Sequence, residues 1–160
     1  MPTRTGIRLR PAGPDDRPLL YDVYASTRTE EMAVVGWDAA QVEAFLTQQF
    51  EVQDTYYREH YPHASFDVVL ADGTPAGRLS VARGPEEIRV VDIALLPAFR
   101  NRGIGTTLLR ELIDEGASSG RPVTVHVERF NPAMRLYERL GFRPVENRGV
   151  HVLLRCTPDA

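Results

Sequence analysis

The sequence predicts a mixed α/β domain, and three observations lead to this prediction. Segments with strand periodicity and segments with helix periodicity alternate along all 160 residues, without internal repeats. The chain length and the hydrophobic content of 42% suit one domain, covering residues 1–160, that buries its own core. The Asp72-Gly73 pair, between apolar runs at residues 66–70 and 76–82, predicts an antiparallel hairpin within the sheet.

The first part of the chain predicts one strand and two helices. Residues 7–10 are typical of a strand, and Pro14 with the two aspartates that follow predicts a helix ending near residue 27. A second helix has a sharper start, because Asp38 can cap it with Gln41 three residues later. An apolar stripe with helical spacing then extends this helix towards His60.

The second part of the chain continues the alternation. Residues 87–95 are apolar on both faces for much of their length, as a central strand would be. Asn131-Pro132 predicts the start of a short helix with the asparagine as its cap, and Gly141 predicts its end. Periodicity and flanking residues predict a further helix at about 104–120 and strands at 123–127, 143–146 and 150–155.

The balance of charges excludes several classes of function. All 19 basic residues are arginine, so the chain lacks the lysine that P-loop nucleotidases, protein kinases and Schiff-base enzymes each require. The net charge of −3 argues against a surface built to bind nucleic acid.

The cysteine and histidine residues and the hydropathy of the chain exclude further kinds of site and of protein. Cys156 is the only cysteine, which excludes an internal disulfide and a cysteine-based zinc site. His60 and His63 are separated by Pro62 and have no third ligand nearby in sequence, so we expect no metal. No apolar segment has the length of a membrane span or of a signal peptide, so the sequence predicts a cytoplasmic protein that does not bind membranes.

The turn at residues 100–105, RNRGIG, carries the strongest functional signal. Two glycines keep side chains away from the backbone N–H groups at the start of the next helix, where the helix dipole favours an anion. These residues alone predict a phosphate-bearing ligand and leave a dinucleotide such as NAD as one alternative. Leu108 at the place of the third glycine, and the proline-containing segment between strand and turn, count against the dinucleotide.

Two motifs together resemble the GNAT family of N-acetyltransferases. Residues 95–109, LLPAFRNRGIGTTLL, resemble its acetyl-CoA-binding motif, a strand followed by Arg/Gln-x-x-Gly-x-Gly/Ala and a helix. Residues 131–142, NPAMRLYERLGF, are similar to its later motif N-x-x-A-x-x-L-Y-x-x-x-G-F. The resemblance implies a mostly antiparallel, twisted sheet of about six to seven strands with a splayed central strand pair, flanked by about four helices. It also implies that acetyl-CoA is the cofactor.

The resemblance assigns cofactor contacts to three parts of the chain. It places the pyrophosphate on the glycine turn and the pantetheine arm against the preceding strand, and Asn131 and Tyr137 also match cofactor-contacting positions. Asn131 is equally suited to capping the short helix and doing nothing else. The residues implied for the turn are Arg100, Asn101, Arg102, Gly103, Ile104, Gly105 and Thr106, and those for the strand are Ile93, Ala94 and Leu95.

The same resemblance suggests how an acetyl group is transferred directly, without an acyl-enzyme. Tyr137 matches the general acid of the family, although its place in an apolar helical stripe would also suit a core residue. The Ile93 N–H would hold the thioester oxygen as negative charge develops on it. The position of the family's glutamate base falls on Arg89, so Glu87, Asp92 or a water relay is left as the base. Asp92 faces the side opposite Arg89 unless a β-bulge intervenes.

The acceptor is expected to be a primary amine of a small molecule or a peptide. In the family, the first two helices and their connection shape its site, which here suggests seven residues. These are Arg28, Glu30, Glu31, Trp37, Gln49, Tyr56 and Tyr57. A homodimer is possible, as is common among relatives, and a non-catalytic acyl-CoA-binding module is the alternative to an enzyme.

Overall fold

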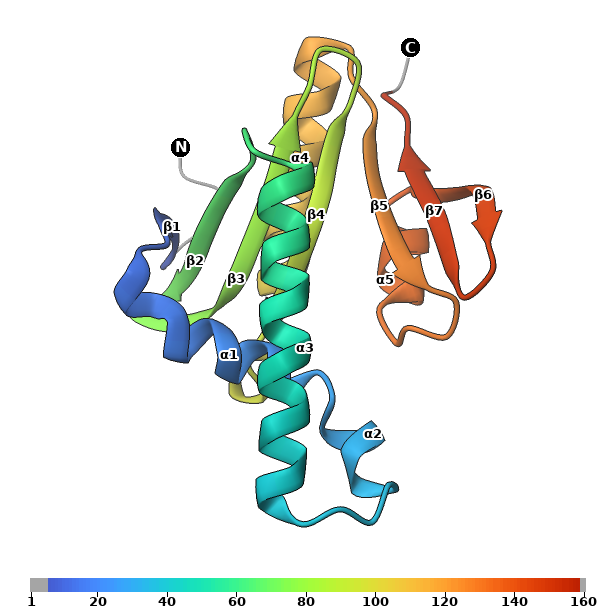
Figure 1. Cartoon of the computed structure of the whole chain (residues 1–160). Helices are drawn as coiled ribbons and strands as arrows, with labels where there is room; N and C mark the ends of the chain where they lie inside the picture. Colours follow the sequence, from blue (N-terminus) through green and yellow to red (C-terminus); the bar gives the residue numbers. More distant parts are fainter. Residues whose placement is uncertain (1–5, 159–160) are drawn as a thin grey trace.

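A seven-stranded sheet forms the centre of the computed structural model, which describes residues 6–158 (Figure 1). Its strand order is β1-β2-β3-β4-β5-β7-β6, and neighbouring strands are antiparallel except for the parallel pair β4 and β5. The mixed, mostly antiparallel sheet that the sequence predicts is therefore confirmed. The strands are β1 (Ile7–Pro11), β2 (Ser65–Ala71), β3 (Thr74–Arg83), β4 (Ile88–Leu95), β5 (Val123–Glu128), β6 (Arg143–Arg148) and β7 (His151–Cys156).

Helices cover both faces of the sheet and create two apolar clusters. In Figure 1, α3 lies in front of β3 and β4, while α4 and α5 lie behind the sheet. The larger cluster packs one face of the sheet against α4 and α5, and the smaller one joins α1 to α3. The helices are α1 (Arg17–Ser26), α2 (Thr29–Ala33), α3 (Ala39–His60), α4 (Ile104–Ser119) and α5 (Met134–Arg139), with 3₁₀ turns η1 (Pro14–Asp16) and η2 (Pro97–Phe99).

Local sequence signals explain where most elements begin. The Asp38 carboxylate accepts a hydrogen bond from the Gln41 N–H at 2.8 Å, and the Gln41 side chain accepts one from the Asp38 N–H at 3.0 Å. The expected capping box at the start of α3 is thus confirmed. The β2–β3 hairpin is confirmed as well, with positive φ angles of 50° at Asp72 and 82° at Gly73.

Two local expectations differ from the structure. The chain forms the short helix α2, which the sequence analysis did not predict, so five α-helices are present among the described residues rather than about four. The other difference is that α5 begins at Met134, not directly after Asn131. The Asn131 side chain accepts a hydrogen bond from the Ala133 N–H at 2.8 Å, which makes a turn before the helix instead of a cap on it.

The parallel pair β4 and β5 is joined over only part of its length. Residues 88–90 of β4 pair with residues 123–125 of β5, and the two strands then diverge, as Figure 1 shows. Immediately beyond this point the β3–β4 register shifts, so that Val81 pairs with Val90 but Ser80 pairs with Asp92. Val91 is therefore the extra residue of a β-bulge. The space between residues 92–95 of β4 and residues 126–128 of β5 is called the gap below.

The capping box offers a direct test of how α3 is held. We expect Asp38→Ala to lower the free energy of unfolding by about 1 kcal/mol, because an N–H at the helix start loses its acceptor. Asp38→Asn is the matched control and should retain most of the stability, since asparagine caps helices as well. Urea denaturation followed by circular dichroism measures both, and equal losses in the two variants would contradict the role assigned to the cap.

Candidate functional site

At the open edge of β4, backbone groups that pair with no neighbouring strand face the gap. The Leu96 N–H donates to the Ala76 carbonyl of β3 at 2.8 Å, and the ladder pairs Ala94 with Arg78. Backbone groups of successive residues in an antiparallel ladder point to alternate sides. Those of Ala94 therefore face β3, whereas those of Ile93 and Leu95 face the gap. Of the three strand residues expected to pair with pantetheine, only Ile93 and Leu95 have backbone groups in that direction.

The glycine turn leaves the start of α4 without a side-chain cap. Gly103 is the residue before the helix and has a φ angle of 81°, and no side chain hydrogen-bonds to the first turn. The N–H groups of Ile104, Gly105 and Thr106 have no partner within the helix, as at every helix start. An anion is the ligand that such a set of N–H groups and the helix dipole favour.

The two arginines of the turn have different surroundings. Arg100 donates from Nε to the Leu95 carbonyl at 2.9 Å and from Nη2 to the Ser26 hydroxyl at 3.1 Å. Its guanidinium thus ties the turn to β4 and to the end of α1. Arg102 is exposed and lies over the ring of Phe99, with 5.5 Å between the guanidinium carbon and the ring centroid. Arg102 therefore has its whole guanidinium available for a ligand, whereas Arg100 already uses two of its five N–H donors.

Tyr137 is buried where α5 packs against the sheet. Only 4% of the residue is exposed, and its ring packs edge-on against Phe142. Burial and the negative charge of Asp92 raise the pKa of the Tyr137 hydroxyl to about 12. The phenol thus stays protonated at neutral pH and can donate a proton or a hydrogen bond. The two expectations for Tyr137 do not exclude each other, because the ring belongs to the core and the hydroxyl is close enough to Asp92 to interact with it.

The two candidate carboxylates lie apart, one just before β4 and the other within it. Glu87, just before the strand, accepts hydrogen bonds from Arg89 at 3.2 Å and from the Thr124 hydroxyl at 2.7 Å, beside the paired part of β4 and β5. Asp92 lies at the gap, because the bulge at Val91 turns it to the face that carries Arg89. Burial raises the pKa of the Asp92 carboxyl, and the nearby Arg78 guanidinium opposes this rise.

Arg78 is a residue of this site that the sequence analysis missed. Only 3% of its side chain is exposed, and its Nε lies 3.2 Å from the Asp92 carboxylate. The available signal was a single charged residue within the apolar run at 76–82, which the hairpin prediction did not use. Arg89, where a base was expected, instead bonds to Glu87, Thr124 and Tyr61.

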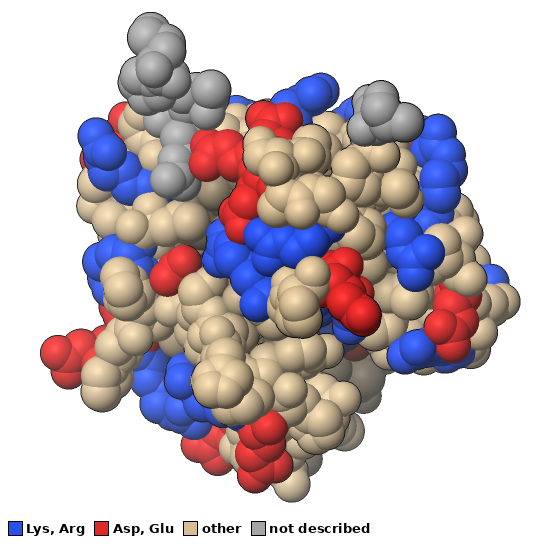
Figure 2. All heavy atoms as spheres, turned by 90° about the horizontal axis from the view of Figure 1, so that it is seen from above, with Lys and Arg blue, Asp and Glu red and all other residues tan. Residues whose placement is uncertain are grey.

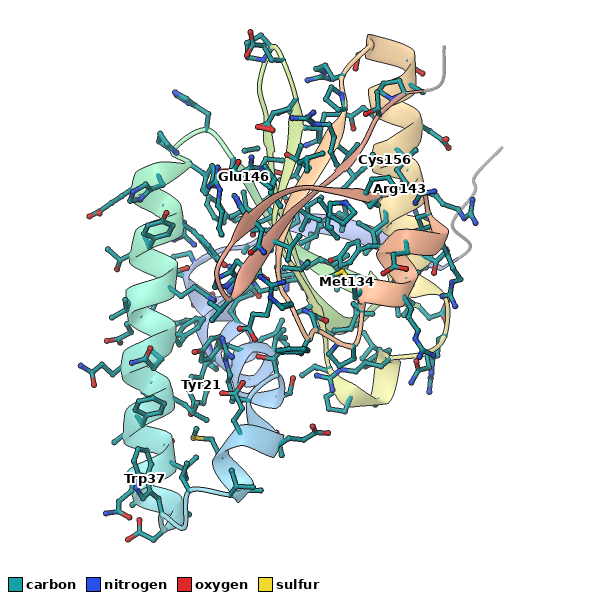
Figure 3. The ribbon with its side chains drawn as sticks, turned by 90° about the vertical axis from the view of Figure 1, so that its right-hand side faces the viewer. Tyr21, Trp37, Met134, Arg143, Glu146 and Cys156 are labelled. Carbon is teal, nitrogen blue, oxygen red and sulfur yellow. The ribbon has the colours of Figure 1, made fainter. Side chains whose placement is uncertain are left out.

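The expected acceptor residues divide into two groups. Tyr57 and Arg28 lie near the gap. The charge of Asp92 acts on the half-buried Tyr57. Arg28 forms ion pairs with Glu31 at 2.9 Å and with Glu128 at 3.5 Å. The Arg28–Glu128 pair links the start of α2 to the end of β5. Trp37 lies at the start of α3, at the lower end of the molecule in Figure 3.

The remaining acceptor candidates lie on α2 or on and just before α3, and the two aromatic ones contact rings of other residues. Tyr56 stacks on His60 with ring centroids 3.8 Å apart, and Trp37 packs against Phe45. Glu30 is exposed on α2 and Gln49 is half-buried on α3. Tyr57 and Arg28 are therefore the two predicted acceptor residues that the fold brings to Asp92.

Neither a metal cluster nor a membrane helix occurs in the described part of the chain. Residues 6–158 contain no group of three or more His, Cys, Asp or Glu side chains placed to hold a metal ion. None of their helices has the length and apolar character needed to cross a bilayer. Arginines and acidic residues lie next to one another on the face shown in Figure 2, so that face carries no continuous basic surface.

Comparison with known families agrees with the two motifs and with the gap. A family profile described as "Acetyltransferase (GNAT) family" matches residues 27–142, more than two thirds of the chain. The chain belongs to the GNAT family. This match covers both the glycine turn and Tyr137, and it extends upstream to the acceptor candidates on α2 and α3.

Curated GNAT relatives resemble part of the chain. A Bacillus subtilis protein named as a ribosomal protein bS18-alanine N-acetyltransferase is 30% identical over 96 residues, which cover 58% of this chain and 64% of that protein. The N-alpha-acetyltransferase RimI of Mycobacterium tuberculosis is 36% identical over 89 residues, which cover 52% of this chain and 55% of that protein. The matched region thus spans less than two thirds of either relative.

Solved GNAT structures share the whole fold at low identity. The PaiA N-acetyltransferase of Thermoplasma acidophilum, solved in complex with coenzyme A, superposes with a TM-score of 0.70 at 18% identity, covering 94% of this chain and 98% of that one. An acetyltransferase of Thermus thermophilus gives a TM-score of 0.67 at 22% identity, covering 93% and 95%. The expected family fold is therefore confirmed.

The two glycines of the turn should respond differently to alanine. We expect Gly103→Ala to lower the free energy of unfolding by about 1–2 kcal/mol, because its left-handed backbone disfavours any Cβ. Gly105→Ala is the matched control: the added Cβ would meet only the Leu136 Cδ2 atom at 3.9 Å, an ordinary contact. Urea denaturation compares the two, and a Gly105→Ala loss as large as that of Gly103→Ala would contradict this difference.

Proposed function

We propose that this protein is an N-acetyltransferase that moves the acetyl group of acetyl-CoA to a primary amine, the N-terminal α-amine of a protein. The observation that carries the proposal is the convergence on one gap of an uncapped helix start, an open strand edge and a protonated tyrosine. The names of the two curated relatives support a protein amine as acceptor.

The residues around the gap fit a CoA molecule. The uncapped N–H groups of Ile104, Gly105 and Thr106 suit a pyrophosphate, and Arg102 adds a positive charge. The Ile93 carbonyl and the Leu95 N–H at the open edge suit the amide groups of a pantetheine arm, which can pair with them as a further strand would. The Asn131 side-chain NH₂ is free to donate to the cofactor because only its oxygen is used in the turn before α5. When bound, acetyl-CoA supplies the activated thioester.

Tyr137 and Ile93 would stabilise the charges that develop during transfer. As the amine nitrogen bonds to the acetyl carbon and the carbon–sulfur bond breaks, the Ile93 N–H holds the carbonyl oxygen. Tyr137 gives its proton to the departing thiolate and regains one from solvent. Its pKa of about 12 keeps the proton in place until the thiolate forms.

Asp92 is the carboxylate placed to remove the amine proton. Burial raises its pKa towards the range in which a general base works best at neutral pH. The Ile93 N–H also hydrogen-bonds to the Asp92 carboxylate and lowers its pKa. Since a neutral carboxyl is the weaker acceptor, proton uptake by Asp92 would release this N–H for the thioester oxygen. Glu87 is a less suitable base, because Arg89 and Thr124 already occupy it away from the gap.

One observation keeps a non-catalytic acyl-CoA-binding module as the second candidate. Arg89 stands at the family's glutamate position and is held there by Glu87 and Thr124. A binding module would hold acetyl-CoA at the same turn without releasing CoA to any amine. Turnover, rather than binding, is therefore the measurement that separates the two candidates.

Cofactor preference can be measured by thermal unfolding. We expect acetyl-CoA and CoA to raise the melting temperature, in line with a stabilisation of about 2.7 kcal/mol at a hundredfold excess over the dissociation constant. NAD at the same concentration should leave it unchanged. A shift with NAD as large as that with CoA would favour a dinucleotide site instead.

Loss of the Tyr137 hydroxyl should slow the reaction without weakening cofactor binding. We expect Tyr137→Phe to reduce kcat by about 10²–10⁴-fold, because the thiolate then leaves without its proton donor. CoA release is measured with peptides that carry a free N-terminal amine. Tyr21→Phe, on α1 against Phe50, is the matched control and should keep the wild-type rate. An unchanged rate in Tyr137→Phe would remove this residue from the mechanism.

A further inference from the structure

Arg78 is an unusual residue for the middle of a β-sheet. It lies on β3 opposite Ala94, and only 3% of its side chain is exposed. An arginine side chain keeps its positive charge at any pH at which proteins fold, so burial cannot neutralise it. The interior next to the gap therefore contains a permanent cation.

Asp92 is the acidic residue paired with this cation. The Arg78 Nε and the Asp92 Oδ2 lie 3.2 Å apart, and the bulge at Val91 puts both side chains on one face of the sheet. Although Nε lies within ion-pair distance of Asp92, neither Nε nor the buried Nη1 forms a hydrogen bond of good geometry among the described residues. A buried pair with unused donors contributes little to stability, and apolar residues of similar volume often serve a fold as well. Stability alone thus does not account for the pair.

The charged and titratable groups around Asp92 come from four elements. Arg78 faces it from β3, Arg28 from the start of α2, Tyr57 from α3 and Tyr137 from α5. Burial raises the pKa of both tyrosines, so they are neutral near pH 7. Arg28 also pairs with Glu31 and Glu128, which leaves Arg78 as the cation committed to Asp92.

We propose that Arg78 is a positioning residue for acetyl transfer, which holds Asp92 at the gap as an anion ready to accept the proton of the acceptor amine. Without this cation, burial would favour the protonated carboxyl, which cannot take a proton. The proton passes from the amine to Asp92, and Arg78 keeps its own protons throughout. This inference rests on the proposed N-acetyltransferase function.

The test is the pH dependence of kcat/KM for CoA release in matched arginine variants. The acid limb of this profile reports two pKa values, that of the base in the free enzyme and that of the free acceptor amine, and only the first should change between variants. We expect Arg78→Gln to shift the acid limb to higher pH by about 1–3 units, because a cation this close lowers the pKa of a carboxyl by that amount. On the limb, each unit means an approximately tenfold loss of rate. The KM for acetyl-CoA should stay near the wild-type value.

Two controls accompany this variant. Arg83→Gln removes another arginine of β3, which pairs with Glu115 at 2.6 Å outside the gap, and it should leave the profile unchanged. Arg78→Lys retains a cation and should restore most of the wild-type limb. Asp92→Asn should remove the contribution of the carboxyl to the acid limb and lower kcat/KM by about 10²-fold or more.

The possible outcomes distinguish a failure of the proposed function from a failure of the role assigned to Arg78. If the wild-type protein releases no CoA with any amine, the proposed function fails. If the wild-type protein is active and folded Arg78→Gln keeps the wild-type limb, the role of Arg78 is overturned.

Should Arg78→Gln not fold, the wild-type protein still provides a test. The Asp92 carboxyl can be titrated by ¹³C NMR, with its signal assigned through Asp92→Asn. A carboxyl that ionises below pH 7 despite its burial supports the proposal. One that stays protonated above pH 8 overturns it.

Discussion

The separation of β4 from β5 after Val90 is the constraint on which the rest of the site depends. Backbone groups in a half-buried strand need partners, and the loss of β5 leaves those of Ile93 and Leu95 without a neighbouring strand. The bulge at Val91 adds a second effect, because it reverses which face each later side chain occupies. Two irregularities at neighbouring residues thus produce an open edge for a ligand and a carboxylate beside a buried arginine.

Packing on the two faces of the sheet fixes what surrounds this gap. On one face, Tyr137 and Ile104 are buried in the same cluster, so the proton donor and the helix start are held by one core. On the other face, Asp92 and Arg78 lie beneath the helices α1 and α3. In the proposed reaction, the acid and the base therefore approach the transferred group from opposite faces of the sheet. This arrangement lets Tyr137 and Asp92 each keep the surroundings that set the pKa of its side chain.

Local signals predicted the elements well, and the misses have identifiable physical causes. The capping box of α3, the Asp72-Gly73 hairpin and the central strand at 87–95 all depend on neighbouring residues, and all three are present. The start of α5 was misplaced because Asn131 can accept a hydrogen bond in a turn as readily as in a cap. The side of the strand that Asp92 faces could not be predicted, since a bulge depends on pairing with β3.

The sequence by itself determined the family, the mixed sheet and the glycine turn, because motif spacing and short-range periodicity express these directly. Tertiary structure decided which residues meet at the gap. Arg78 and Asp92 are adjacent only because β3 and β4 pair across a bulge. Tyr57 and Arg28 join them only because α3 and the start of α2 pack over that face. Contacts of this kind depend on strand register and helix packing, which are properties of the folded chain as a whole and leave no local pattern in the sequence.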